Sequence, residues 1–300
     1  MTKPGPHLYD YLLLFGLAAI WGGAFVLIKI AAEEIAPATQ TAYRLFFAVA
    51  LLWVIFLVGK QGFPRDWKTH GLLFLAGCGG TAIPFFLIAW GQQVVAPGLT
   101  SVLMAIMPLI TLLAAHYFTH DEKLSLFKVL GVLLGIIGVS VLVGPSILLG
   151  LGGDIVHQGA ILLAASCYAM NAVVTKFLLH LSKTQLVTLS ITYAFVPMIF
   201  MARFIDGPLT LDYSFVPMAA VGVLAVLQTV LASFMLVLLI KRQGANFFSQ
   251  INLLVPLFGV FWAFLIFSEQ PSINSGLALF IILLGVFVAS RRFKSDSTGA

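Results

Sequence analysis

Residues 97–122 have the sequence PGLTSVLMAIMPLITLLAAHYFTHDE, and this stretch decides the class of fold. A helix of this length rises about 1.5 Å per residue and crosses a hydrocarbon core of about 30 Å. No Asp, Glu, Lys or Arg occurs before Asp121 and Glu122, while Pro108 lies near the middle. A proline there would cost a soluble helix about 3 kcal/mol. In a membrane protein it is tolerated where neighbouring helices satisfy the freed carbonyl, so the stretch predicts a membrane-spanning helix.

The same pattern recurs in ANFFSQINLLVPLFGVFWAFLIFSE at residues 245–269, with a shift of 148 residues between Pro108 and Pro256. The shift also aligns Ser101 with Ser249 and the terminal acid Asp121 with Glu269. A second pair, AAIWGGAFVLIK at 18–29 and ASCYAMNAVVTK at 165–176, repeats with a shift of 147. We infer a duplicated membrane domain, with a first five-helix repeat over 9–144, a linker loop over 145–156 and a second repeat over 157–291.

Composition excludes several classes of protein. The chain is 61% hydrophobic and 9% charged, with a mean hydropathy of +1.07, whereas soluble domains carry about 25% charged residues. The basic residues behind the net charge of +5 form no patch, so no nucleic-acid partner is expected. Cys78 and Cys167 lie inside apolar runs without paired spacing, and neither a metal nor another cofactor is predicted. Phosphate-loop, HExxH and GxSxG motifs are missing from the sequence, which argues against an enzyme.

Ten apolar runs predict an all-α membrane protein in the lipid bilayer. Their approximate limits are 10–30, 38–59, 70–91, 98–118, 125–144, 157–178, 185–204, 214–239, 246–267 and 273–290. With the N-terminus inside, thirteen of the 16 Lys and Arg residues fall on the cytoplasmic side and three, Lys29, Arg44 and Arg203, on the other. This bias predicts an inner-membrane protein with both termini in the cytoplasm. Because each repeat has five spans, the second repeat is predicted to be inverted relative to the first, around a central cavity.

Polar, aromatic and methionine side chains inside the spans are the candidate substrate-binding residues, because polar groups in lipid are costly unless they face a cavity or another helix. Several share a helix face at spacings of three or four residues. The predicted set is Trp21, Phe86, Trp90, Gln93, Met104, Met107, Tyr168, Asn171, Gln228, Ser249 and Asn252. Six of these, Trp90, Met104, Tyr168, Asn171, Gln228 and Asn252, are expected to meet near the midplane.

The charges within the spans constrain the ligand. Lys29, Arg44, Lys176 and Arg203 are all predicted near span ends, and no basic pair or buried carboxylate is predicted at the midplane. A carrier of phosphates would need Arg or Lys to bind them. The predicted cavity therefore suits a neutral or zwitterionic ligand with an apolar or aromatic side chain.

Prolines and glycines suggest two further roles. Pro108 and Pro256 occupy matching places in spans four and nine, and interrupted helices at corresponding positions indicate a transporter's binding and gating region. We predict hinges at both prolines. Gly131, Gly135 and Gly138 allow a close helix contact in span five, which we interpret as packing within the chain, with a homodimer through the same face as the alternative.

Taken together, these stretches resemble the EamA-type exporters of the drug/metabolite transporter superfamily. The resemblance rests on AAIWGGAFVLIK, on YRLFFAVALL at 43–52, on the MP…DE ending of span four, on the VP…SEQP run of span nine and on LGVFVASRR at 284–292. It covers about residues 9–292. Within the family the aromatic faces are most similar to YddG-type exporters of aromatic and other neutral amino acids.

The resemblance implies export of such amino acids or related small metabolites from the bacterial cytoplasm by alternating access. The alternatives are a channel, a membrane-embedded enzyme, or a carrier of another metabolite class in the same superfamily, such as a sugar phosphate, a nucleotide sugar or a cationic drug.

Overall fold

The computed structural model of the protein describes residues 7–118, 126–143, 154–178, 180–243 and 251–290. Every secondary-structure element in these ranges is a helix. Six helices are long and apolar enough to span a membrane, and four shorter apolar helices accompany them. This confirms the all-α membrane fold. The helices are α1 (Leu8–Ala31), α2 (Pro37–Val58), α3 (Trp67–Gly77), α4 (Ile83–Gly91), α5 (Pro97–Met104), α6 (Met107–Phe118), α7 (Leu126–Val143), α9 (Asp154–Lys176), α10 (Lys183–Ile205), α11 (Phe215–Val223), α12 (Ala232–Gln243), α14 (Ile251–Phe267) and α15 (Ile273–Ser290), with π-helical segments η1 (Cys78–Ala82) and η2 (Leu224–Leu231).

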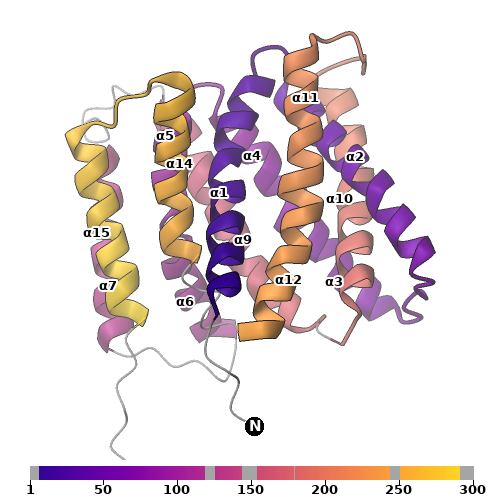
Figure 1. The fold of residues 1–300 in the computed structure, drawn as a ribbon, viewed down its shortest axis with the longest axis horizontal. Helices are drawn as coiled ribbons and strands as arrows, with labels where there is room; N and C mark the ends of the chain where they lie inside the picture. The colour runs from indigo at the N-terminus through magenta and orange to yellow at the C-terminus, as the bar shows by residue number, and fades with distance from the viewer. Residues whose placement is uncertain (1–6, 119–125, 144–153, 179, 244–250, 291–300) are drawn as a thin grey trace, which may run out of the picture.

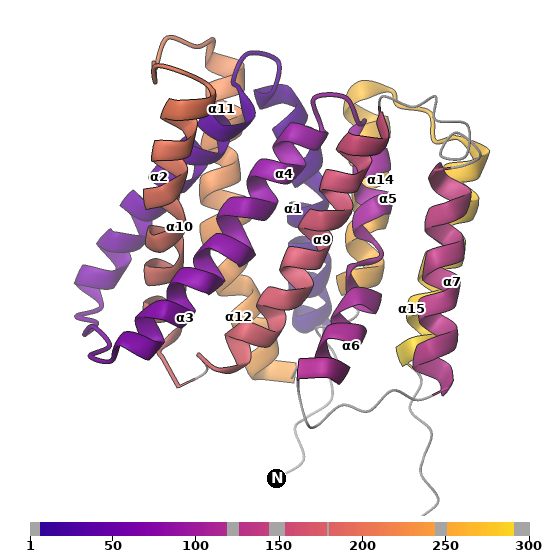
Figure 2. The ribbon, with the colours of Figure 1, turned by 180° about the vertical axis from the view of Figure 1, so that it is seen from behind.

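Several elements combine into single spans. Span three consists of α3, η1 and α4, span four of α5 and α6, and span eight of α11, η2 and α12. The helices lie in two layers, with α15, α14, α1 and α12 in front in Figure 1 and α7, α5, α6, α9 and α4 in front in Figure 2. Helix α1 begins and α15 ends at the same end of the bundle (Figure 1). We call this the N end and the opposite one the far end.

Local sequence explains where several helices begin. Pro37 and Pro97 stand at the first position of α2 and α5, where the missing N–H has no intrahelical partner to lose. The Asp66 carboxylate accepts a hydrogen bond from the backbone N–H of Thr69, 2.8 Å away, at the start of α3. Ser182 and Gln185 form a capping box at the start of α10. These signals are local, which is why the sequence places the spans within a few residues.

The helices of the two halves pack against each other reciprocally. Helix α1 contacts α11, η2, α12 and α14, while its counterpart α9 contacts α3, η1, α4, α5 and α6. Span two meets span seven through α2 and α10, and span five meets span ten through α7 and α15. This reciprocity is what a two-fold axis in the membrane plane requires. The repeat boundaries at 144 and 157 stay a prediction.

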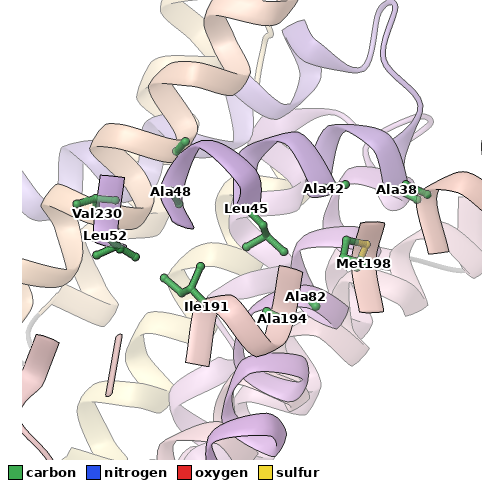
Figure 3. Close-up of a cluster of buried hydrophobic side chains, with 12 residues drawn as sticks. Ala38, Ala42, Leu45, Ala48, Leu52, Ala82, Ile191, Ala194, Met198 and Val230 are labelled. Carbon is green, nitrogen blue, oxygen red and sulfur yellow. The ribbon is translucent and has the colours of Figure 1, made fainter. Parts of the chain in front are cut away.

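Small residues bring α2 and α10 together (Figure 3). One face of α2 contributes Ala38, Ala42, Leu45, Ala48 and Leu52, all buried, at spacings of three and four residues. On the other side, α10 contributes Ile191, Ala194, Met198 and Ala202, and spans three and eight add Ala82, Ala225 and Val230. In a membrane the hydrophobic effect does not drive helices together, because the lipid tails are as apolar as the helix surfaces. Alanines let the two backbones approach closely, so van der Waals packing stabilises the contact instead.

The glycine face of span five packs within the chain. A Cβ on Gly138 would lie 3.1 Å from the carbonyl oxygen of Ala278 in α15, and a Cβ on Gly285 would lie 2.7 Å from that of Gly131. A Cβ on Gly135 would overlap the side chain of Leu109 in α6. The face therefore sits against α15 and α6, as close intramolecular packing predicts. A homodimer through it stays untested.

Candidate functional site

Two predicted site residues, Met104 and Tyr168, come from different spans and pack in the same buried region. Both pack against one buried apolar group, which we call the central cluster: Phe25, Ile28, Ile88, Ala89, Ala164 and Leu224. Its members come from α1, α4, α9 and η2, and α5 contributes Met104. Spans one, three, four, six and eight therefore converge at this point, and α1 and α9 lie in the middle of the two layers (Figures 1 and 2).

The two π-helical segments occupy matching positions in spans three and eight. Shifting η1 by the 147 residues of the repeat places it on residues 225–229, inside η2. Such segments within longer helices frequently mark functional sites. Sequence reasoning missed both. The available signal was Gly79-Gly80 followed by Pro84, because a proline at 84 cannot donate to the carbonyl of Gly80 four residues earlier.

Polar side chains from spans eight and nine hold the middle of α1. The Gln228 amide nitrogen, in η2, donates to the carbonyl oxygen of Ile20, and the indole Nε1 of Trp262 donates to that of Ala19 over 3.1 Å. The amide oxygen Oε1 of Gln228 is buried without a donor. Gln228 therefore connects η2 to α1 through a hydrogen bond, and its amide oxygen is still able to accept one.

Asn171 lies against the other π segment. A Cβ on Gly80 of η1 would overlap the Asn171 amide, so a larger residue at position 80 would displace that amide. The Oδ1 of Asn171 is buried and has no hydrogen-bond donor. Because Tyr168 precedes Asn171 by three residues on α9, both side chains share a face of that helix. Asn171 is thus a second buried acceptor on the Tyr168 face.

Arg44 lies against η2 and α4 in the structure, whereas the sequence predicted its charge near the end of span two. Its side chain is buried, only 6% exposed. The guanidinium carbon lies 3.5 Å from the ring centre of Phe85, and Nε donates to the hydroxyl of Thr229 in η2 over 3.1 Å. It is close enough to Tyr168 for the two to interact electrostatically. A long side chain can carry its charge far from its own Cα, which explains the difference from the sequence-based position.

Span four is broken between its two predicted methionines. Helix α5 ends at Met104 and α6 begins at Met107, with Pro108 next. In between, Ala105 and Ile106 donate to carbonyls only three residues earlier, over 3.1 and 3.4 Å. Pro108 removes the donor that the Met104 carbonyl would otherwise have. The break is therefore at the level of the central cluster.

Span nine differs, because α14 continues as a helix through Pro256. It is held by α5: the Ser101 hydroxyl donates to the carbonyls of Gly98, over 2.7 Å, and of Pro256, over 3.3 Å. A Cβ on Gly259 would overlap the Ser101 side chain. The two proline-containing spans thus touch directly. Whether they act as hinges stays a prediction.

Four other predicted residues lie outside the central cluster. Trp21 packs with residues of α12 and α14, and Phe86 packs in the α2–α10 contact. Trp90 stacks on His157, with ring centres 4.5 Å apart, near the far end. Gln93 is exposed beyond the end of α4. Of the predicted residues, Met104 and Tyr168 therefore share the central cluster, whereas these four lie elsewhere.

Two predicted residues remain undescribed in whole or part. Ser249 lies outside the described residues. Asn252 belongs to α14, and its side chain lies outside the described part.

Two contacts at the far end connect different spans, one within the first half and one between the two halves. The Lys29 ammonium donates to the carbonyls of Gln92, over 2.9 Å, and of Gln93, over 3.3 Å, just past the end of α4. The Glu269 carboxylate accepts from the backbone N–H of Gly98, 3.1 Å away, at the start of α5. Both charges suit the helix ends they meet, because helix C-termini attract cations and N-termini attract anions.

The EamA-like transporter family matches two segments of the chain, residues 8–144 and 158–291. An uncharacterized transporter of Bacillus subtilis, YoaV, is 22% identical over 94% of this chain and 96% of its own length. A protein of Escherichia coli named "Probable amino-acid metabolite efflux pump" is 25% identical over 93% of this chain and 94% of its own.

A solved crystal structure that carries no functional name has a similar fold. It aligns with a TM-score of 0.66 at 17% sequence identity, covering 95% of this chain and 97% of that one. At this identity the likeness concerns the fold alone.

Proposed function

Because the chain belongs to the EamA-like transporter family, part of the drug/metabolite transporter superfamily, we propose that it exports aromatic and other neutral amino acids, or related small metabolites. The multi-pass membrane protein would act as a secondary transporter in the bacterial inner membrane, by alternating access. It is proposed not to be an enzyme. Its two halves, residues 9–144 and 157–291, would rock about the central cluster.

One observation supports this proposal most: Met104 and Tyr168 pack on one cluster that joins five spans, while the amide oxygens of Asn171, beside η1, and of Gln228, within η2, are buried without donors. Aromatic and thioether groups provide an apolar surface for a side chain. The amides provide hydrogen bonds for a polar ligand end. The E. coli relative named as an amino-acid metabolite efflux pump supports the same class of substrate.

The direction of export depends on orientation. We propose that the N end faces the cytoplasm, because most of the lysines and arginines among the described residues belong to helix ends and loops on that side, as the positive-inside rule expects. In the state described here, Lys29 and Glu269 connect helices at the far end. For a substrate to leave outward, these contacts would have to separate.

Counterflow in liposomes tests the proposal. The purified full-length protein is reconstituted, loaded with each of the twenty unlabelled amino acids in turn, and supplied with trace labelled phenylalanine outside. Saturable accumulation above that of protein-free liposomes is expected for aromatic and other neutral amino acids. Equilibration without counterflow would instead indicate a channel. Accumulation driven by sugar phosphates, nucleotide sugars or cationic drugs alone would replace the amino-acid assignment.

A further inference from the structure

Arg44 is a buried cation with unused hydrogen-bond donors. A guanidinium has five N–H donors, and the only acceptor recorded for Arg44 within the described residues is the Thr229 hydroxyl. Among the described residues, no carboxylate lies within ion-pair distance of Arg44. Placing a charge in a low-dielectric interior costs several kcal/mol unless a partner compensates it. The face of the Phe85 ring compensates the charge only in part.

The surroundings of Arg44 favour a particular anion. The planar guanidinium group can donate two parallel hydrogen bonds to the two oxygens of a carboxylate. The cations that spans one and seven carry near the far end do not accompany Arg44: Lys29 donates to backbone carbonyls past the end of α4, and Arg203 is exposed in the last turn of α10. A phosphate dianion would need a second cation, so a single arginine fits a monoanionic carboxylate.

Acceptors for an ammonium group are present in the same region. The Oδ1 of Asn171 and the Oε1 of Gln228 are buried without donors. Gln228 lies in η2, the same π segment as Thr229, which binds Arg44. Asn171 lies about one helical turn after Tyr168 on α9, and Tyr168 interacts electrostatically with Arg44. An ammonium group offers three donors and no acceptor. Two amide oxygens and one arginine thus complement the two charged ends of an amino acid.

We propose that Arg44 binds the carboxylate of the transported substrate, with Thr229 holding the guanidinium in place. This inference rests on the proposed function, because it names the group that recognises an amino acid. It makes the carboxylate, rather than the side chain alone, a condition for binding.

A comparison of ligands on the wild-type protein provides the first test. Binding of L-phenylalanine, L-phenylalaninamide, 3-phenylpropionate and inorganic phosphate is measured by calorimetry in detergent. The amide keeps the ring and ammonium but lacks the carboxylate. Loss of a charge-assisted bond should weaken its binding at least about tenfold relative to phenylalanine.

Variants then assign the effect to Arg44. Arg44→Gln should lose the preference for phenylalanine over its amide, whereas Arg203→Gln, the same change at an exposed arginine, should keep it. Arg44→Lys should retain part of the preference, because lysine keeps the positive charge but cannot donate the two parallel hydrogen bonds of a guanidinium. Thr229→Val, which leaves the arginine in place, should reduce the preference less than Arg44→Gln, so the test survives if Arg44→Gln does not fold.

The outcomes separate the inference from the function. Equal binding of phenylalanine and its amide, or an intact preference in Arg44→Gln, overturns the Arg44 site and leaves amino-acid transport standing. Arg44-dependent binding of 3-phenylpropionate without binding of phenylalanine supports the carboxylate site and overturns the amino-acid assignment. A preference for phosphate, or no binding of any of the four compounds, overturns the inference.

Discussion

The carboxylate of Asp10, in the first turn of α1, accepts a hydrogen bond from Nε of Arg242, near the end of α12, over 2.6 Å. Asp10 is completely buried and also accepts from the amide of Gln243 and the backbone N–H of His7, over 2.7 and 3.0 Å. The contact joins the first span of the chain to the eighth at the N end.

This pair predicts a coupled effect on stability. Asp10→Ala should lower the midpoint of thermal unfolding in detergent, because hydrogen bonds to charged groups contribute about 1.5–3 kcal/mol each. Arg242→Ala should add little to Asp10→Ala, since the interaction is already lost. In the control pair, Asp10→Ala with Arg203→Ala, the effects should add. Additive effects for Asp10 with Arg242 would show that their contact contributes nothing.

The close contact of α14 with α1 and α5 predicts intolerance of larger side chains. A Cβ on Gly22 would lie 2.7 Å from that of Phe258, and one on Gly259 would overlap Ser101. Gly22→Ala and Gly259→Ala should each destabilise the protein by about 1–3 kcal/mol, because overpacking forces the helices apart. Gly222→Ala is the matched control, since nothing lies near its Cβ position. Thermal unfolding that is unchanged in Gly259→Ala would contradict the observed contact.

The prolines of spans four and nine predict a kinetic effect. Pro108→Ala restores a donor at the break between α5 and α6 and should stiffen span four; Pro256→Ala should act similarly in α14. If the prolines are hinges, counterflow rates fall much more than calorimetric affinity does, because conformational steps are slowed. Pro37→Ala, at the first turn of α2, should leave the rate unchanged. Unchanged rates in both test variants would mean that the hinge lies elsewhere.

The buried amide of Asn171 predicts weaker binding when it is removed. Asn171→Ala should weaken calorimetric affinity for phenylalanine by about 1.5–3 kcal/mol, because it deletes a hydrogen bond to a charged ligand end. Gln93→Ala removes an exposed amide at the far end and should have no effect on affinity. Wild-type affinity in Asn171→Ala would remove this residue from the site.

Orientation predicts a pattern of thiol labelling. In a background of Cys78→Ala and Cys167→Ala, single cysteines replace Arg65 at the N end, Gln270 at the far end and Ser146 in the linker. A membrane-impermeant reagent added to intact cells should label the Gln270 and Ser146 positions and not that of Arg65. The reverse pattern would place the N end outside and overturn the proposed direction of export.

Local and periodic features of the sequence were sufficient for the architecture. Long apolar runs, proline at helix starts and the repeat of Pro108 at Pro256 place the spans, because spanning a bilayer requires each helix to satisfy its own backbone. The π segments were not predictable in the same way. They depend on which backbone register neighbouring helices stabilise, and Gly80 shows this, since its lack of a side chain matters only once Asn171 lies against it.

The sequence by itself determined the class of fold, the number of spans and the membership of Tyr168, Asn171 and Gln228 among the polar groups that must avoid lipid. Only the tertiary structure decided which residues pack together, placing Met104 and Tyr168 on one cluster and the Trp90 ring beside that of His157. The tertiary structure also directs the Arg44 side chain inward to Phe85 and Thr229, whereas the sequence predicted this charge near a span end. The physical reason is that periodicity specifies the face of a helix, whereas the partner of that face, and the reach of a long side chain, depend on helices distant in sequence.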